Sequence, residues 1–341
     1  MLIIASIGPH LDENSIRKII LAGADVLRIN FSYETVERNL KFIDTVEEIL
    51  NNLNSASKIM IDLPLNKICL GDIELKLFSV KENEELIFQS GTSSPNCYEF
   101  IPVDTPHLAE KVKINQTISL GNGRVSMQVL EIINHDTIKI RALNNGIIKS
   151  YQTFNNETAR TTEEMIVVYK KIIDYLANSN AKFLAIPYNK DKSFIDDIKK
   201  SGLLTNIPFK PKLIININHP ITDEEIEGLC QDKTFNFVNI DRGELGVNMP
   251  FEKFGLYQQH IVAIAKKYNK PLIFATHILS STIDNYIPTR SDIIDLTNIV
   301  QEDIAAGIIF SKETNASKRP AYAISTAKKI INEVLKSKKI K

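Results

Sequence analysis

Eight short apolar runs recur along this chain of 341 residues, and their recurrence restricts the possible folds more than any other feature. Segments between them have the periodicity of amphipathic helices, with start signals such as Thr161-Thr162 before two glutamates, and Asp223-Glu224-Glu225. Buried parallel strands alternating with helices are typical of the α/β class and of the (β/α)8 TIM barrel. The pattern predicts this barrel, closed by a helix at about 321–335. The eight runs are residues 2–7, 26–29, 59–62, 183–187, 213–217, 235–240, 272–276 and 307–311.

The interval after the third run breaks this alternation. Roughly residues 70–156 read as short strands separated by turn signals, among them Gly121-Asn122-Gly123 and Asn144-Asn145-Gly146. We expect a small β-barrel-like domain inserted after strand three, with the main barrel formed by residues 1–69 and 157–341. Such an insertion would stand over the barrel mouth, meaning the C-terminal ends of the strands, where barrel enzymes keep their sites, and act as a lid. An inert insertion is the alternative. The strands expected in it are 86–89, 98–102, 117–120, 125–133 and 137–142.

Composition restricts the partners and the compartment. The chain carries 41 basic and 41 acidic residues, which argues against nucleic acid or an anionic membrane as the main partner. Its three cysteines have no metal-type spacing, as a reducing compartment permits. The first ten residues show neither a basic leader nor a membrane span. We therefore expect a cytoplasmic protein, and the sequence leaves open whether it forms a homo-oligomer.

Seven motifs, taken in order along the chain, resemble those of the pyruvate kinase family. The resemblance covers essentially the whole chain and implies a transferase, or kinase, that acts on phosphoenolpyruvate and pyruvate. Because the chain ends just after its eighth helix, we expect it to lack the C-terminal domain of many family members. The motifs are SIGP at 6–9, VLRINFS at 26–32, Asp62 before the insertion, DRGELG at 241–246, AT at 275–276, PTR at 288–290 and SKET at 311–314.

The ends of strands two and three carry oxygen and cation groups suited to a phosphate site. Arg28 can hold a phosphate or carboxylate through paired hydrogen bonds, with a structural ion pair as the alternative. By resemblance, Asn30, Ser32 and Asp62 match three of the four side chains that hold a potassium ion beside the substrate. Leu63 stands where the family has the fourth, a threonine, which argues against potassium binding.

The ends of strands six and seven match the family's pocket for the substrate carboxylate. By resemblance, the backbone N–H groups near Gly243 and Glu244 hold that carboxylate together with Thr276, as helix N-termini commonly do with anions. The Glu244 side chain matches an aspartate that ligates a divalent metal. We therefore expect a pocket for a small carboxylate to be retained.

Strand five departs from the family at the positions that carry the chemistry. Asn216 stands where the resemblance places a lysine, and Asn218 where it places a glutamate that ligates magnesium. A neutral amide cannot stabilise charge on a transferring phosphoryl group or enolate as an ammonium does. The site for Mg²⁺ or Mn²⁺ also drops to one carboxylate, Glu244, with at best an amide oxygen from Asn218, so it is weakened.

Further substitutions point the same way. Pro64 and Cys69 replace a lysine and an arginine that the family uses near the nucleotide, which argues against ATP or ADP binding. Three residues near the mouth are candidates for a relocated cation: Lys67, Lys312 and Arg124. His219 and His277 follow Asn218 and Thr276 and are candidate acid–base groups, although a lone histidine is more often structural.

Three hypotheses remain open at this point. The first is an active pyruvate kinase with a relocated cation. The second, which the sequence favours, is an enzyme of altered chemistry acting on a small keto-acid or phosphoryl substrate. The third is a non-catalytic binding or scaffold protein that keeps the pocket.

Overall fold

The computed structural model describes residues 1–65, 67–74, 77–120, 125–155, 161–188, 192–205 and 207–340. The chain divides into two compact units. The first consists of Met1–Phe31, Val36–Pro64 and Val168–Lys341, and the second of Ser32–Thr35 and Leu65–Val167.

The first unit is a closed barrel of eight parallel strands, which confirms the predicted fold class. Its strands follow one another around the barrel in the order β1, β19, β18, β17, β16, β15, β3 and β2. Every strand coincides with one of the eight apolar runs, to within two residues at each end. The strands are β1 (Leu2–Ile7), β2 (Val26–Asn30), β3 (Lys58–Asp62), β15 (Ala181–Tyr188), β16 (Lys212–Ile217), β17 (Phe237–Asp241), β18 (Leu272–Ala275) and β19 (Ala305–Phe310).

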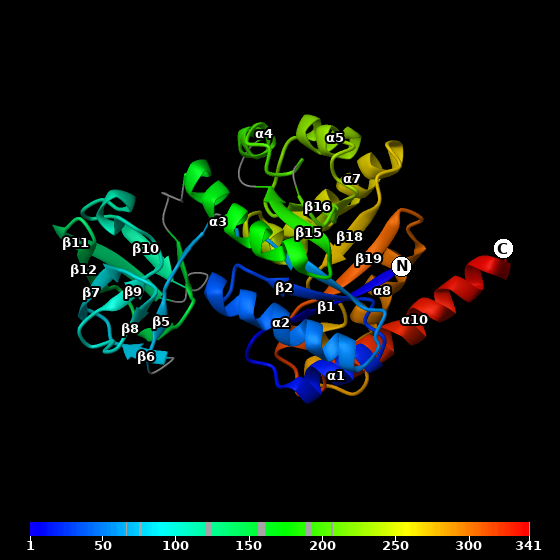
Figure 1. Cartoon of the computed structure of the whole chain (residues 1–341), viewed down its shortest axis with the longest axis horizontal. Coiled ribbons are helices and arrows are strands. Elements are labelled where there is room, and N and C mark those ends of the chain that lie inside the picture. Colours follow the sequence, from blue (N-terminus) through cyan, green and yellow to red (C-terminus); the bar gives the residue numbers. More distant parts are fainter. Residues whose placement is uncertain are drawn as a thin grey trace. The chain divides into compact units, whose positions relative to one another are not determined.

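Helices connect the barrel strands, and in Figure 1 α1, α2 and α10 lie outside them. The predicted start signals lie at the starts of two helices. Thr161 and Glu164 exchange hydrogen bonds at the start of α3, and Glu225 forms a capping box on α5 with Thr222, the residue before the predicted signal. No helix in the described part of the chain is long and apolar enough to cross a membrane. The α-helices are α1 (Glu13–Leu21), α2 (Val36–Asn52), α3 (Thr162–Tyr175), α4 (Lys192–Lys200), α5 (Asp223–Gln231), α6 (Arg242–Val247), α7 (Phe251–Lys267), α8 (Arg290–Gln301), α9 (Lys312–Asn315) and α10 (Pro320–Ile340), with 3-10 turns at Leu176–Asn178 and Ser280–Ile283.

Apolar side chains from every second position fill the barrel interior. Ile4, Met60, Ile214 and Ile309 are fully buried there, from four different strands. Two residues further along each of these strands, the next inward-facing positions carry polar residues. These polar residues therefore gather at the C-terminal ends of the strands.

The second unit is a β domain with a core of its own. Its main sheet has seven strands in the order β4, β14, β10, β11, β12, β7 and β9. Two separate two-stranded sheets pair β6 with β13 and β5 with β8. One expected strand is largely wrong: residues 97–99 form a turn and β9 begins only at Ile101. The expected turn at 121–123 lies outside the described residues. The strands are β4 (Ile68–Cys69), β5 (Asp72–Ile73), β6 (Leu77–Val80), β7 (Glu85–Ser90), β8 (Ser93–Ser94), β9 (Ile101–Val103), β10 (Thr117–Leu120), β11 (Val125–Asn134), β12 (Thr137–Ala142), β13 (Gly146–Lys149) and β14 (Thr153–Asn155), with a 3-10 turn, η1, at Leu108–Lys111.

Candidate active site at the barrel mouth

Strand register brings polar residues from neighbouring strands together at the barrel mouth. Asn30 pairs with Asp62 across β2 and β3, and Asn216 pairs with Asn239 across β16 and β17. The strands β16 and β17 run parallel, and Asn218 and Asp241 each come two residues after one member of this pair. Asn218 and Asp241 are therefore also neighbours, one step closer to the mouth. The residues form two groups, described below as the Arg28 network and the Asp241 cluster.

The Arg28 network consists of Ser6, Arg28, Asp62, Asn216 and Asn239, all buried. The Arg28 guanidinium donates to Asp62 Oδ2 at 2.8 Å and to Ser6 Oγ at 2.8 Å. Asn216 Nδ2 donates to Asp62 Oδ1 at 2.9 Å, and Asn216 Oδ1 accepts from Asn239 Nδ2 at 3.0 Å. Both polar atoms of Asn216 are therefore used in a continuous chain of hydrogen bonds, and the position carries no charge.

This network also bears on the expected potassium ligands. Both carboxylate oxygens of Asp62 already accept hydrogen bonds, from Arg28 and from Asn216. Ser32 belongs to the second unit, where its hydroxyl accepts from the Leu65 backbone N–H at 3.0 Å. Leu63, at the place of the fourth ligand, is a buried apolar side chain.

The Asp241 cluster consists of Asn218, Asp241, Glu244, Thr276 and Ser311. Asn218 Nδ2 donates to Asp241 Oδ2 at 3.0 Å, and Thr276 Oγ1 lies 3.4 Å from Asp241 Oδ1 and 3.5 Å from Ser311 Oγ. The Glu244 backbone N–H points at Asp241 Oδ1 over 3.5 Å, with Asp241 as the N-cap of α6. Asn218 Oδ1 is buried and makes no hydrogen bond to any described residue.

Asp241 holds its proton unusually well. Burial raises the pKa of its carboxyl group from 3.8 to about 6; the positive charge of Arg28 opposes this shift, and the negative charges of Glu244 and Asp62 add to it. A buried carboxyl that titrates near neutrality, among polar groups at a barrel mouth, is typical of a functional site.

The turn that follows β18 is held in an unfavourable backbone conformation. Thr276 and His277 have φ angles of 72° and 56°, in the left-handed region, which a β-branched residue rarely adopts. Arg242 fixes this turn, because its guanidinium donates to the carbonyl oxygens of Thr276 at 2.7 Å and His277 at 3.0 Å, while forming a two-pronged ion pair with Asp295. Strain maintained in this way is common where a side chain must be presented to a ligand.

Gly243 lies so close to Thr276 that a larger residue there would be tightly packed against the Thr276 side chain. A Cβ atom added at Gly243 would lie 3.0 Å from Thr276 Cγ2 and 3.1 Å from Thr276 Oγ1. The start of α6 and the Thr276 hydroxyl are thus side by side, as the expected carboxylate pocket requires.

The two candidate acid–base histidines occupy different surroundings. The His219 ring packs 6.0 Å from that of Tyr188, whose hydroxyl donates to Glu225, and His219 Nε2 makes no hydrogen bond to a described residue. His277 lies in the left-handed turn, and partial burial together with the positive charges of Arg242 and Lys312 lowers its pKa, so the ring is neutral near pH 7.

Of the three candidate cations, one can be placed at the barrel mouth. Lys312 is exposed at the start of α9, separated from β19 by Ser311 alone, and its positive charge lowers the pKa of His277. Lys67 belongs to the second unit, and Arg124 lies outside the described residues.

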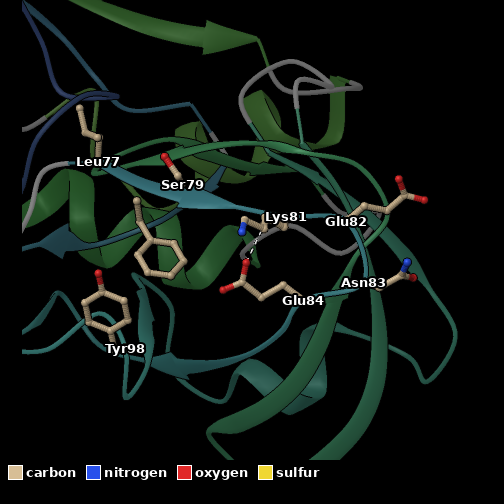
Figure 2. Close-up of a pocket in the computed structure, with 8 residues that line it drawn as sticks. Leu77, Ser79, Lys81, Glu82, Asn83, Glu84 and Tyr98 are labelled. Atoms are coloured by element: carbon tan, nitrogen blue, oxygen red, sulfur yellow. Dashed lines mark hydrogen bonds between the residues drawn. The ribbon is translucent and has the colours of Figure 1, made fainter.

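A hollow of about 650 Å³ in the second unit offers a different set of groups (Figure 2). Phe78 and Tyr98 meet edge to face on one side of it, at 5.3 Å between ring centres, and the Lys81 backbone N–H donates to Glu84 on the other. No histidine or cysteine is among the described residues that line it, and its two carboxylates, Glu82 and Glu84, lie in or next to the turn at 82–83. The Arg28 network and the Asp241 cluster are therefore the stronger candidate.

Sequence reasoning assigned no role to Asp241, Asn239 or Arg242. A signal was present, because Asn239 and Asp241 alternate at the end of strand six as Asn216 and Asn218 do at the end of strand five. The sequence gives no comparable indication of the role of Arg242, because the backbone turn that it fixes follows a different strand, β18.

Comparison with known proteins points to one family. The family model described as pyruvate kinase, barrel domain, matches residues 1–324. Pyruvate kinase of Thermotoga maritima is 28% identical over 341 residues, covering 98% of this chain and 71% of the relative, and that of Thermococcus litoralis is 27% identical over 330 residues, covering 96% and 68%. The crystal structure of Cryptosporidium parvum pyruvate kinase shares the fold with a TM-score of 0.79 at 24% identity, covering 98% of this chain and 70% of that one.

Proposed function

Because this chain belongs to the pyruvate kinase family, we propose that it binds a small carboxylate or phosphoryl compound at the barrel mouth. Phosphoenolpyruvate and small keto acids are the proposed class of ligand. We further propose that it is an enzyme whose chemistry differs from phosphoryl transfer to ADP.

The state of Asn216 carries this proposal. At the position where the family resemblance places a lysine, an amide is tied on both sides into a neutral link between Asp62 and Asn239. A cation that clamps a transferring phosphoryl group is worth about 10³-fold or more in rate. Efficient phosphoryl transfer is therefore not expected from these residues.

The carboxylate pocket is supported by the approach of Gly243 to Thr276 and by the strained turn that presents the Thr276 hydroxyl. A substrate carboxylate would accept from that hydroxyl and from backbone N–H groups near Gly243 and Glu244. Arg28, within reach of the same end of the barrel, is the candidate for a second anionic group, exchanging part of its pairing with Asp62.

A divalent cation fits the Asp241 cluster. Glu244 and Asp241 supply carboxylate oxygens, and the buried Asn218 Oδ1 lacks a partner among the described residues. Mg²⁺ and Mn²⁺ prefer such oxygen donors. Asp241 would thereby replace the carboxylate that strand five lost at Asn218. Such an ion would supply positive charge to offset the repulsion between these carboxylates and a bound anion.

The test is a continuous assay of pyruvate formation from phosphoenolpyruvate and ADP, with Mg²⁺ and K⁺ present. We expect negligible turnover from the unmodified chain, and at most a trace from Asn216→Lys combined with Asn218→Glu. Thermal protection by oxalate shows in parallel that the pocket still binds. Turnover of about 1 s⁻¹ or more, as ordinary kinases show, would contradict the proposal.

Robust turnover would favour the active kinase with a relocated cation. Substituting Lys312, Lys67 and Arg124 by alanine, one at a time, would then identify it, with Lys312 first because it lies at the barrel mouth, at the start of α9. Oxalate binding without turnover of any keto acid or phosphoryl compound would favour the non-catalytic alternative.

A further inference from the structure

Three potential metal ligands meet on the surface of the second unit, at a place that the proposed function does not use. His107, His135 and Asp136 each offer one ligand atom, and these atoms all lie within 4.8 Å of one another. His135 and Asp136 form the tip of the hairpin between β11 and β12, and His107 directly precedes η1.

Backbone hydrogen bonds hold the two segments together. The His107 N–H donates to Asp136 Oδ1 at 3.0 Å, and the Ala109 N–H donates to the His135 carbonyl at 3.1 Å. His107 itself has a left-handed backbone, with φ 54° and ψ 51°. The two segments are therefore already held next to each other, so an ion would not have to bring them together, which lowers the cost of forming a site.

The two imidazole rings present the same nitrogen to each other. His107 Nδ1 and His135 Nδ1 lie 2.8 Å apart, with ring centres at 4.2 Å. Two lone pairs cannot face each other at this distance, so one ring must carry a proton on Nδ1 or both must share a cation.

Glu110 favours one tautomer of His135. Its carboxylate lies 2.8 Å from His135 Nε2 and can only accept, so that nitrogen donates; in the neutral ring, His135 Nδ1 then keeps its lone pair. A carboxylate behind a histidine in this way orients the ring and raises its basicity in metal sites. His107 needs only the tautomer with its proton on Nε2 to direct a second Nδ1 lone pair to the same point.

The geometry points to a site for a divalent transition-metal ion, of the class of Zn²⁺, Ni²⁺ or Cu²⁺, formed by His107, His135 and Asp136 with Glu110 behind His135. Two imidazoles and one carboxylate suit these ions, whereas Mg²⁺ prefers oxygen donors alone. All four side chains are at least half exposed, which leaves room for water in the remaining coordination positions. The ion would join the β11–β12 hairpin to the segment 107–110.

The experiment is calorimetric titration of the metal-stripped full chain with ZnCl₂ in the presence of excess MgCl₂. We expect one zinc ion per chain at this site, with affinity lowered at least tenfold in His107→Asn and in His135→Ala. Asparagine tolerates the left-handed backbone at 107, so the first variant should fold. Glu110→Gln should weaken binding by about 10–100-fold although it removes no ligand atom.

His260→Ala is the matched control, because His260 is also exposed and paired with a carboxylate, at 2.8 Å from Asp223, but belongs to no group of three potential ligands among the described residues. It should bind zinc as the unmodified chain does. Equal affinity in His107→Asn, His135→Ala and the unmodified chain would overturn the assignment. Unchanged affinity in Glu110→Gln would overturn the role given to Glu110.

Discussion

Asp241 occupies the donors that a substrate carboxylate would need. Its Oδ1 atom faces the Thr276 hydroxyl at 3.4 Å and the Glu244 N–H at 3.5 Å, the same two groups assigned to the pocket. Both distances are long for hydrogen bonds, so the donors are only weakly engaged. An incoming anion could compete for them, provided that Asp241 is protonated or a cation lies between the two carboxylates.

The raised pKa of Asp241 predicts a pH-dependent effect of Asp241→Asn on stability. The pKa is about 6 in the folded chain and 3.8 as its ordinary value. Below pH 3.8 both states are protonated and the group does not affect stability. As pH rises from 3.8 towards 6, the unfolded state ionises while the folded state keeps its proton, so the folded state loses stability until pH has passed the folded pKa of about 6. Asparagine avoids this loss.

We therefore expect the stability advantage of Asp241→Asn over the unmodified chain to grow by about 1 kcal/mol between pH 5 and pH 8. Urea unfolding in the presence of a chelator measures it. The comparison across pH cancels any hydrogen bond that the substitution loses. Asp303→Asn is the control, because Asp303 is exposed and its pKa is lowered by Lys338. A difference that stays constant with pH would contradict the assignment.

At the scale of elements, long buried strands could be predicted from the sequence and short ones could not. The barrel strands are continuous apolar runs because both of their faces are covered, and all eight were predicted. The strands β4, β5 and β8 have two residues each, too few to show any period. The expected strand at 98–102 begins late because the Asn96 side chain accepts from the Tyr98 N–H at 3.0 Å and closes a turn. The aromatic residues Tyr98 and Phe100 favour a strand, so the sequence does not indicate this turn.

The sequence predicted several of the residues at the candidate site, but not how they are bonded to one another. Residues at strand ends could be assigned to the mouth, but their hydrogen-bond partners depend on register between strands far apart in sequence. The link from Asn216 to Asp62 spans 154 residues. Nothing local in the sequence could indicate that Asp241, rather than a ligand, would face Thr276.

Helix α6 allows a matched test of the carboxylate pocket, because it contains two glycines. Alanine at Gly243 would place a methyl group about 3 Å from the Thr276 side chain, in the space where we place the carboxylate. Alanine at Gly246 would meet nothing closer than Phe254 at 3.9 Å. Both substitutions add one methyl group to the same helix.

We expect oxalate with Mg²⁺ to raise the melting temperature of the unmodified chain and of Gly246→Ala, and to leave that of Gly243→Ala unchanged. Thermal denaturation followed by circular dichroism at 222 nm measures all three. Equal protection of both variants would remove Gly243 and Thr276 from the pocket. No protection of the unmodified chain would remove the pocket itself.

At the scale of the whole molecule, each unit carries a hydrophobic core of its own. Ile140 in β12 and Ile214 in β16 are both fully buried, the first in the core of the β domain and the second in that of the barrel. Units with separate cores open as separate cooperative units when few contacts couple them. We predict that residues 70–156 behave as a domain in this sense.

The pair Ile140→Val and Ile214→Val tests this, because each removes one methylene from a fully buried isoleucine at a cost of about 1 kcal/mol. Native-state hydrogen exchange, read by mass spectrometry on separate peptides, reports each core independently. Ile140→Val should speed exchange of peptides from 125–142 about fivefold and leave 212–217 unchanged, and Ile214→Val should do the reverse. If either variant speeds exchange in both sets of peptides equally, the two cores unfold together as one cooperative unit, and the prediction of a separate domain at residues 70–156 is contradicted.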